Sequence, residues 1–216
     1  MEGFLLIDKE KGFTSFDVVR GVRQLCGVKK VGHGGTLDPL ATGLLVVAVG
    51  RSSTKKLHTL LKSDKEYEVV AAFGYISDSY DADGHLTRVK YDESATFNKK
   101  NIEKIISKNF IGEIEQMPPK YSALKVKGRR ACDIVRAGGK VELKSRKIRI
   151  DSFEIMDFQW PEVRFRVKCG SGTYIRSLIH DLGQSLGCGA YVKELRRTKV
   201  GEYVVEDAVK LEEILC

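Results

Sequence analysis

The chain has 216 residues, of which 42% are hydrophobic and 31% charged, so it holds enough apolar sequence for the core of one large domain. No apolar run is long enough to cross a bilayer, and the N-terminus has no basic region followed by a long apolar one, so we expect a cytoplasmic protein with no membrane partner. The cysteines and histidines are scattered without the spacing of metal ligands, which predicts that no metal is bound.

The net charge of +8 is concentrated in one segment. Residues 120–149 contain eleven Lys or Arg and two acidic residues, a net of +9, whereas the rest of the chain has 26 basic and 27 acidic residues. Charge gathered in this way is typical of a surface that binds a polyanion. Charge alone also allows a solvated basic segment that has no partner.

The first part of the chain predicts both strands and helices. They are a strand at 4–7, a helix from 14 or 15 to about 26, a strand at 44–49, a helix at 53–61 and a strand at 65–74. Thr14 or Ser15 can cap the first helix, and Gly27 suits the position after its end. This helix is expected to bury one stripe of side chains, made of Phe16, Val19, Val22 and Cys26.

The second part predicts a similar mixture. It has a loop at 77–85, a helix capped by Asn98, strands at about 147–158 and at 163–169, a helix from Thr173 to about Leu186, and a final strand with a short helix. Since strands and helices follow one another without a regular βαβ rhythm, we expect an α+β fold with a mixed, largely antiparallel sheet flanked by helices. The chain has neither a P-loop nor a GxGxxG motif, so no nucleotide cofactor is expected.

A glycine-rich loop at 34–43, GGTLDPLATG, presents a candidate catalytic carboxylate. Pro39 disfavours helical backbone at Asp38, and the flanking glycines let a ligand or another segment approach closely. The apolar strand that follows gives the loop a rigid base. Such a carboxylate can act as a nucleophile, a base or a metal ligand, and the alternative is an aspartate that only bonds within its own turn.

The sequence around Asp38 resembles the catalytic motif of the TruB family of tRNA pseudouridine synthases. Further segments match that family in its own order between about residues 4 and 201. They are DKEKGFTSFDVV, KEYEVVAAFG, DSYDADG, PPKYSALKVKGRRA, GSGTYIRSLIHDLG and LGCGAYVKELRRTKVG. The resemblance implies the pseudouridine synthase fold and the conversion of uridine to pseudouridine in the T-loop of tRNA, at position 55 in tRNA numbering.

The resemblance also implies roles for single residues. Asp38 matches the catalytic aspartate, Tyr67 the tyrosine that stacks on the target base and is a candidate general base, and Arg176 the arginine that pairs with the aspartate. The substrate-binding residues that it implies are His33, which enters the T-loop, Tyr174 and Leu195, which line the pocket, and Lys9 near the site. The basic segment adds Lys120, Lys125, Lys127 and Arg129 as substrate-binding residues.

The reaction explains why these residue types are needed. Pseudouridine formation breaks the N1–C1′ bond, turns the uracil and rejoins it through C5, so the detached ring must be held and water kept out. An arginine favours the anionic form of a buried carboxylate, and an aromatic face holds a base that has left its stack. A side chain such as His33 that enters the RNA loop helps to flip the target nucleotide out.

The domain organisation expected from the resemblance is one catalytic domain over residues 1–216, with a basic thumb-like segment at about 118–147 and no PUA domain. We expect a monomer that acts on the T-stem-loop of tRNA without a cofactor. Two other classes stay open: an RNA-binding protein of this fold that lacks catalysis, and a glycosylase that releases the base. A glycosylase usually needs a second carboxylate at suitable spacing.

Overall fold

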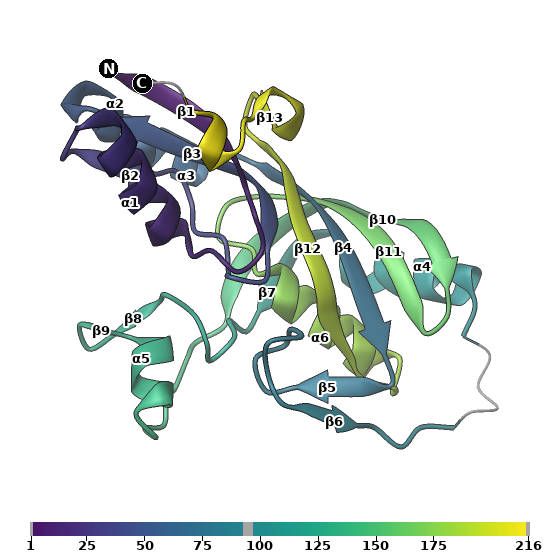
Figure 1. Cartoon of the computed structure of the whole chain (residues 1–216). Coiled ribbons are helices and arrows are strands. Elements are labelled where there is room, and N and C mark those ends of the chain that lie inside the picture. Colours follow the sequence, from purple (N-terminus) through teal and green to yellow (C-terminus); the bar gives the residue numbers. More distant parts are fainter. Residues whose placement is uncertain (1, 93–96, 215–216) are drawn as a thin grey trace. The chain divides into compact units, whose positions relative to one another are not determined.

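The structure is a computed structural model that describes residues 2–92 and 97–214 (Figure 1). It divides into two compact units. The first unit comprises Met1–Glu68, Arg166–Ser171 and Glu194–Cys216, and the second comprises Val69–Phe165 and Gly172–Lys193. Three strands contribute residues to both units: β4 (Lys65–Phe73), β11 (Glu162–Cys169) and β12 (Ala190–Val200).

The first unit is built on a mixed sheet with the order β1-β3-β12-β4-β11. β1 (Gly3–Lys9) and β2 (Val31–His33) both run antiparallel to β3 (Thr42–Val49), whereas β12 runs parallel to β3. Every side chain of β3 from Leu44 to Val49 is buried. The unit also contains α1 (Ser15–Cys26), α2 (Arg51–Lys55), α3 (Leu57–Lys62), β13 (Tyr203–Val204), η1 (Val205–Asp207) and η2 (Leu211–Glu213).

The structure confirms both predicted ends of helix α1 but not its predicted buried face. The Thr14 hydroxyl accepts the Asp17 N–H, the Asp17 carboxylate accepts the Thr14 N–H, and Gly27 follows the helix with φ of 65°. Val19 and Val22 are buried as expected. Phe16 is 58% exposed, because the buried face turns toward Ser15 and Val18 instead. The helix expected at 53–61 is two short helices, α2 and α3, separated at Lys56.

The second unit has the strand order β12-β4-β11-β10-β7, in which β10 (Arg146–Gln159) and β7 (Gly112–Gln116) are antiparallel. Its longer helices are α4 (Lys99–Asn109) and α6 (Ile175–Ser185). The predicted Asn98 cap of α4 is confirmed, since its side chain accepts the Asn101 N–H. The predicted Thr173 cap is wrong: α6 begins one residue later, after Tyr174, without a side-chain cap.

Two small sheets complete the second unit. β5 (Tyr75–Ser77) and β6 (Leu86–Arg88) form a hairpin around the segment predicted as a loop at 77–85. The basic segment forms the hairpin of β8 (Lys125–Val126) and β9 (Arg129–Arg130), followed by α5 (Ala131–Arg136), and Figure 1 shows this group lying apart from β10 and β11. The mixed sheet with flanking helices confirms the α+β prediction. No helix within residues 2–92 and 97–214 has the length and apolar character needed to span a bilayer.

Candidate active site

The loop that carries Asp38 joins β2 to β3 in the first unit and is held by the turn between β1 and α1. The Ser15 hydroxyl donates to the Leu37 carbonyl and accepts the Leu37 N–H, at 3.1 and 2.8 Å. The Gly12 N–H donates to the Pro39 carbonyl at 2.8 Å, and a turn closes from the Ala41 N–H to the Asp38 carbonyl. Asp38 itself is half-buried, and these bonds fix the backbone on both sides of it.

Of the two lysines in the DKEKG motif, Lys9 is the one that contacts this loop. Its side chain is 1% exposed, whereas Lys11 is exposed to solvent. The Lys9 ammonium donates to the carbonyls of Glu10, Phe13 and Pro39, at 2.9, 2.7 and 3.4 Å. Burial lowers the pKa of Lys9 from 10.5 to about 8, although the nearby Asp38 charge acts in the opposite direction. The Lys9 ammonium therefore holds the Asp38 loop at Pro39, and its role in substrate binding stays a prediction.

Tyr67 and Leu195 are buried side chains of the first unit, 7% and 8% exposed, on β4 and β12. Burial raises the pKa of Tyr67; the nearby Arg197 guanidinium opposes this rise, and the Asp38 charge adds to it. The Asp38 and Arg197 charges therefore both reach the phenol. A phenol that senses both charges suits the base-contacting role that the resemblance gives to Tyr67.

His33, the last residue of β2, is half-buried in the same unit. Burial lowers its pKa, the Arg197 charge lowers it further, and the nearby Gly35 backbone acts in the opposite direction. The imidazole is thus favoured in its neutral form near pH 7. A neutral ring can enter an RNA loop by stacking, without having to pair with phosphate.

Arg176 lies in the second unit, at the start of α6, and is 4% exposed. Its two terminal nitrogens donate to the carbonyls of Ser79 and Tyr121, at 2.8 and 2.9 Å, and its Nη1 lies 3.5 Å from an Asp81 carboxylate oxygen. Asp81 is itself buried and belongs to the predicted DSYDADG loop. The pairing of Arg176 with Asp38 stays a prediction, because the two residues belong to different units.

Tyr174, the residue before α6, is held by a buried glutamine. The Gln116 side chain accepts the Tyr174 N–H at 2.9 Å and donates to its carbonyl at 3.0 Å, as a neighbouring strand would. The Arg146 guanidinium lies 4.7 Å from the centre of the Tyr174 ring. Backbone and ring are thus both fixed, which orients the tyrosine for a role as a pocket residue.

The predicted RNA-binding residues of the basic segment all face solvent: Lys120, Lys125, Lys127 and Arg129. Lys127 and Gly128 form the tip of the β8–β9 hairpin, and both have positive φ, of 49° and 84°. Positive φ at both central residues is typical of the two-residue hairpin turns that match strand twist. The turn therefore presents the Lys127 side chain at an exposed tip.

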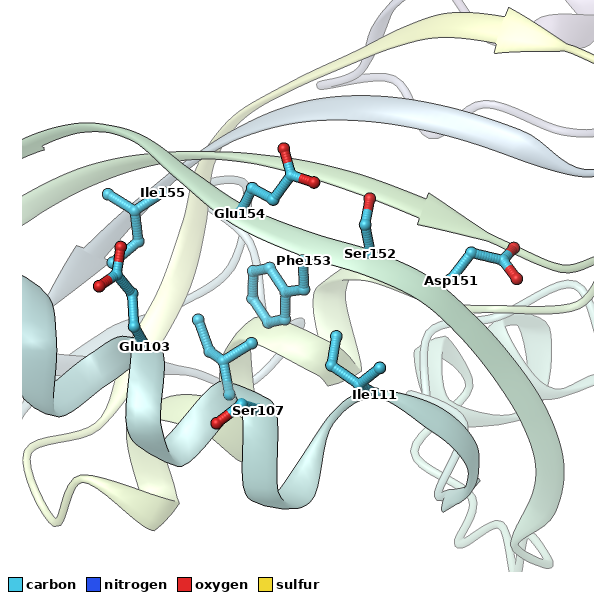
Figure 2. A pocket seen from close by; sticks show the side chains of 9 residues that line it. Glu103, Ser107, Ile111, Asp151, Ser152, Phe153, Glu154 and Ile155 are labelled. Carbon is cyan, nitrogen blue, oxygen red and sulfur yellow. The ribbon is translucent and has the colours of Figure 1, made fainter.

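Two other features bear on what the site can bind. No group of three or more His, Cys, Asp or Glu within residues 2–92 and 97–214 could hold a metal ion. A pocket of about 480 Å³ lies in the second unit between α4 and β10, and Figure 2 shows Glu103, Asp151 and Glu154 around it. None of the residues predicted for catalysis lines this pocket, so it is separate from the candidate site.

Sequence reasoning missed Arg197 and Gln116, and it placed the Asp81 loop near the site without pairing Asp81 with Arg176. Alternation along β12 places Arg197 on the same buried face as Leu195, and this signal could have revealed an inward-facing arginine. Asp81 lies in a motif that the resemblance had already located. Gln116 gives no local signal, because its partner, Tyr174, is 58 residues away in the chain.

Two protein-family models match the chain. The N-terminal domain of the TruB family pseudouridylate synthases matches residues 23–175, and the C-terminal domain of tRNA pseudouridylate synthase B matches residues 176–216. The chain belongs to the TruB family. A family relative named tRNA pseudouridine synthase B, from Chlamydia abortus, is 43% identical over 96% of this chain and 86% of its own length. Another of that name, from Endomicrobium trichonymphae, is 44% identical over 99% of this chain and 91% of its own length.

Solved structures confirm the pseudouridine synthase fold. A chain in the crystal structure of a Cbf5-Nop10-Gar1 complex superposes with a TM-score of 0.75 at 32% identity, over 98% of this chain and 53% of that one. A chain of the archaeal box H/ACA sRNP Nop10-Cbf5 complex gives 0.71 at 30% identity, over 98% and 52%. This TruB-family chain therefore spans about half the length of those solved chains.

Proposed function

We propose that this chain isomerises uridine to pseudouridine in the T-loop of tRNA, at position 55 in tRNA numbering, with Asp38 as its catalytic carboxylate. The observation that carries the proposal is the Asp38 loop of a TruB-family chain. That loop is rigidly held, and the Asp38 charge acts on both Tyr67 and Lys9. Membership of the family supplies the reaction class, and the loop supplies the group that performs it.

In the proposed mechanism the target uridine is flipped out of the folded T-loop, with His33 entering the space that it leaves. The Asp38 carboxylate then acts at the ribose, either on the sugar carbon or on a sugar proton, as the N1–C1′ bond breaks. Tyr67 stacks on the detached uracil and serves as a base, while Leu195 and Tyr174 enclose the ring. Arg176 pairs with Asp38 in this proposal.

The basic segment at about 118–147 supplies the phosphate contacts. Its lysines are exposed, as are Arg129 and Arg130, and the Lys127 tip extends from a hairpin. Because phosphate contacts position an RNA without reading its sequence, this segment anchors the T-stem while the site reads the flipped base. A catalytic domain over 1–216, a monomeric state, a cytoplasmic location and catalysis without a cofactor belong to the same proposal.

The Asp38→Asn variant tests the proposal on a T-stem-loop RNA. Product nucleosides are separated by chromatography and weighed by mass spectrometry. The wild type should yield pseudouridine, which has the mass of uridine, and Asp38→Asn should bind the RNA but yield none, because an amide is neither a nucleophile nor a base. Turnover by Asp38→Asn near the wild-type rate would contradict the assignment. Loss of base mass would indicate a glycosylase, and unchanged uridine with the wild type would indicate a binding protein.

A further inference from the structure

Among the described residues, Arg197 has the largest side chain that is completely buried, with 1% of its surface exposed. A guanidinium keeps its positive charge inside a protein, so its burial is unfavourable unless its donors are satisfied. No carboxylate within residues 2–92 and 97–214 forms an ion pair with it. The charge is therefore balanced by backbone carbonyls, and their positions indicate what it does.

The carbonyls that accept from Arg197 lie on both sides of Asp38. The Nη2 and Nη1 atoms donate to the carbonyls of Gly35 and Thr36, at 3.1 and 3.5 Å. The Nε atom donates to the carbonyl of Leu44 at 2.8 Å. One rigid guanidinium thus joins the two ends of the segment that presents the catalytic carboxylate.

Close packing fixes where the guanidinium sits. Arg197 pairs with Gly43 across the parallel β12 and β3 strands, and a Cβ added to Gly43 would lie 2.3 Å from the Arg197 carbonyl oxygen. Gly43 also has a φ of 96°, which a side chain rarely adopts. The register of β12 against the start of β3 therefore tolerates little shift, and the arginine cannot move away from the loop.

The same guanidinium reaches the predicted base-contacting residue. Its charge acts on the Tyr67 phenol, and also on Lys9 and His33. Arg197 therefore lies close to Tyr67 as well as to the loop.

We propose that Arg197 is a positioning residue that locks the Asp38 loop, beside Tyr67, into its catalytic arrangement. The inference rests on the proposed function and adds a residue to it. Lysine at this position would keep the charge but would offer one nitrogen in place of a planar fork with three donor positions. It could not serve the carbonyls on both sides of Asp38 together.

The test compares Arg197→Lys with a matched control on the same strand. Arg196 is the adjacent arginine, its side chain is 38% exposed, and it pairs with the Asp8 carboxylate at 2.7 Å. We expect Arg197→Lys to lower turnover at saturating T-stem-loop RNA by about 100-fold, while RNA affinity changes by less than about threefold. Arg196→Lys should stay within about threefold in both. Turnover by folded Arg197→Lys within about threefold of the wild type would overturn the proposal.

A second measurement covers the case in which Arg197→Lys does not fold. Nitrogen-15 NMR of the wild-type protein and of Tyr67→Phe records the Arg197 side-chain signals without any RNA. These signals should shift when the hydroxyl is removed, and unchanged signals would show that Arg197 does not lie beside Tyr67 and would overturn the proposal. A wild-type protein that forms no pseudouridine would instead reject the proposed function, so the two failures are distinguishable.

Discussion

At the scale of single residues, the buried guanidinium of Arg176 predicts what happens when lysine replaces this arginine. Its guanidinium satisfies two carbonyls and approaches Asp81, a geometry that one ammonium cannot reproduce. We expect Arg176→Lys to lower turnover more than about tenfold, a loss of at least about 1.4 kcal/mol in transition-state stabilisation. The free energy of unfolding should fall by about 1–3 kcal/mol because a carbonyl loses its donor inside the protein.

Single-turnover kinetics and denaturant unfolding check this prediction. Arg164→Lys is the control, because Arg164 belongs to the same unit but faces solvent from β11. It should leave both quantities near their wild-type values. If Arg176→Lys turned over within about twofold of the wild type, roughly 0.4 kcal/mol, Arg176 would have no orienting role.

The buried ammonium group of Lys9 predicts that the activity of the protein depends on pH. Its three ammonium donors match three carbonyls, so loss of the proton leaves one carbonyl without a donor and loosens the loop at Pro39. With a pKa of about 8, this loss should lower kcat/KM as the pH rises through about 8. Lys9→Arg should abolish this alkaline decline because arginine does not titrate there, and Lys11→Arg should keep the wild-type profile.

The sign of the stability effect separates this decline from unfolding. Lys9 releases its proton near pH 8 in the folded protein but near pH 10.5, its ordinary value, in the unfolded chain. Between these values the unfolded state binds more protons, so the contribution of Lys9 to the free energy of unfolding rises with pH. Denaturant unfolding at pH 7.5 and 9 should show no Lys9-dependent loss. If unfolding accounted for the whole decline in activity, the proposed role of Lys9 would be wrong.

The sequence predicted the residues that belong to a short local motif, and it missed those whose hydrogen-bond partners lie far away in the chain. Asp38, Tyr67 and Leu195 each belong to a short motif, so a resemblance could place them. Arg197 binds Gly35, 162 residues away, and Gln116 binds Tyr174, 58 residues away. Such partnerships depend on strand register and are fixed only when the sheet has formed.

At the scale of elements, the hairpin of β8 and β9 gives a prediction about salt dependence. Lys125, Lys127 and Arg129 are exposed on it, and removing one basic side chain from a phosphate should lower the slope of log affinity against log salt by about 0.7–0.9. Neutralising all three to Gln should therefore weaken binding of a T-stem-loop RNA and lower the slope by up to about 2–3 units.

A control with equal charge removal is available on α4, where Lys99, Lys100 and Lys104 are exposed. Their neutralisation should leave the slope close to the wild-type value. Fluorescence anisotropy across a salt series measures both triple variants. Equal effects of the two would mean that only net charge matters, and no effect of either would mean that the basic segment does not touch the RNA.

Local patterns predicted the elements themselves well. The cap at Thr14, the cap at Asn98 and the strict alternation of β11 all have short-range causes and are all confirmed. The errors have tertiary causes. Phe16 was assigned to the core by its spacing, yet packing turned α1 toward Val18. Thr173 does not cap α6, whose N-cap is Tyr174, the residue that the buried Gln116 holds.

At the scale of the whole molecule, the distribution of charge predicts how much of a tRNA is needed. Residues 120–149 carry a net of +9 and the rest of the chain is close to neutral, so electrostatics supplies one main anchoring surface. One surface, together with the proposed site, should need only the T-arm. We expect a T-stem-loop minihelix to be converted with kcat/KM within about tenfold of full-length tRNA, a difference of about 1.4 kcal/mol. Pseudouridine yield over time on both RNAs measures this, and full-length tRNA with its target uridine replaced by cytidine serves as the blank. A minihelix that is bound but never modified, while full tRNA is, would place essential recognition outside the T-arm.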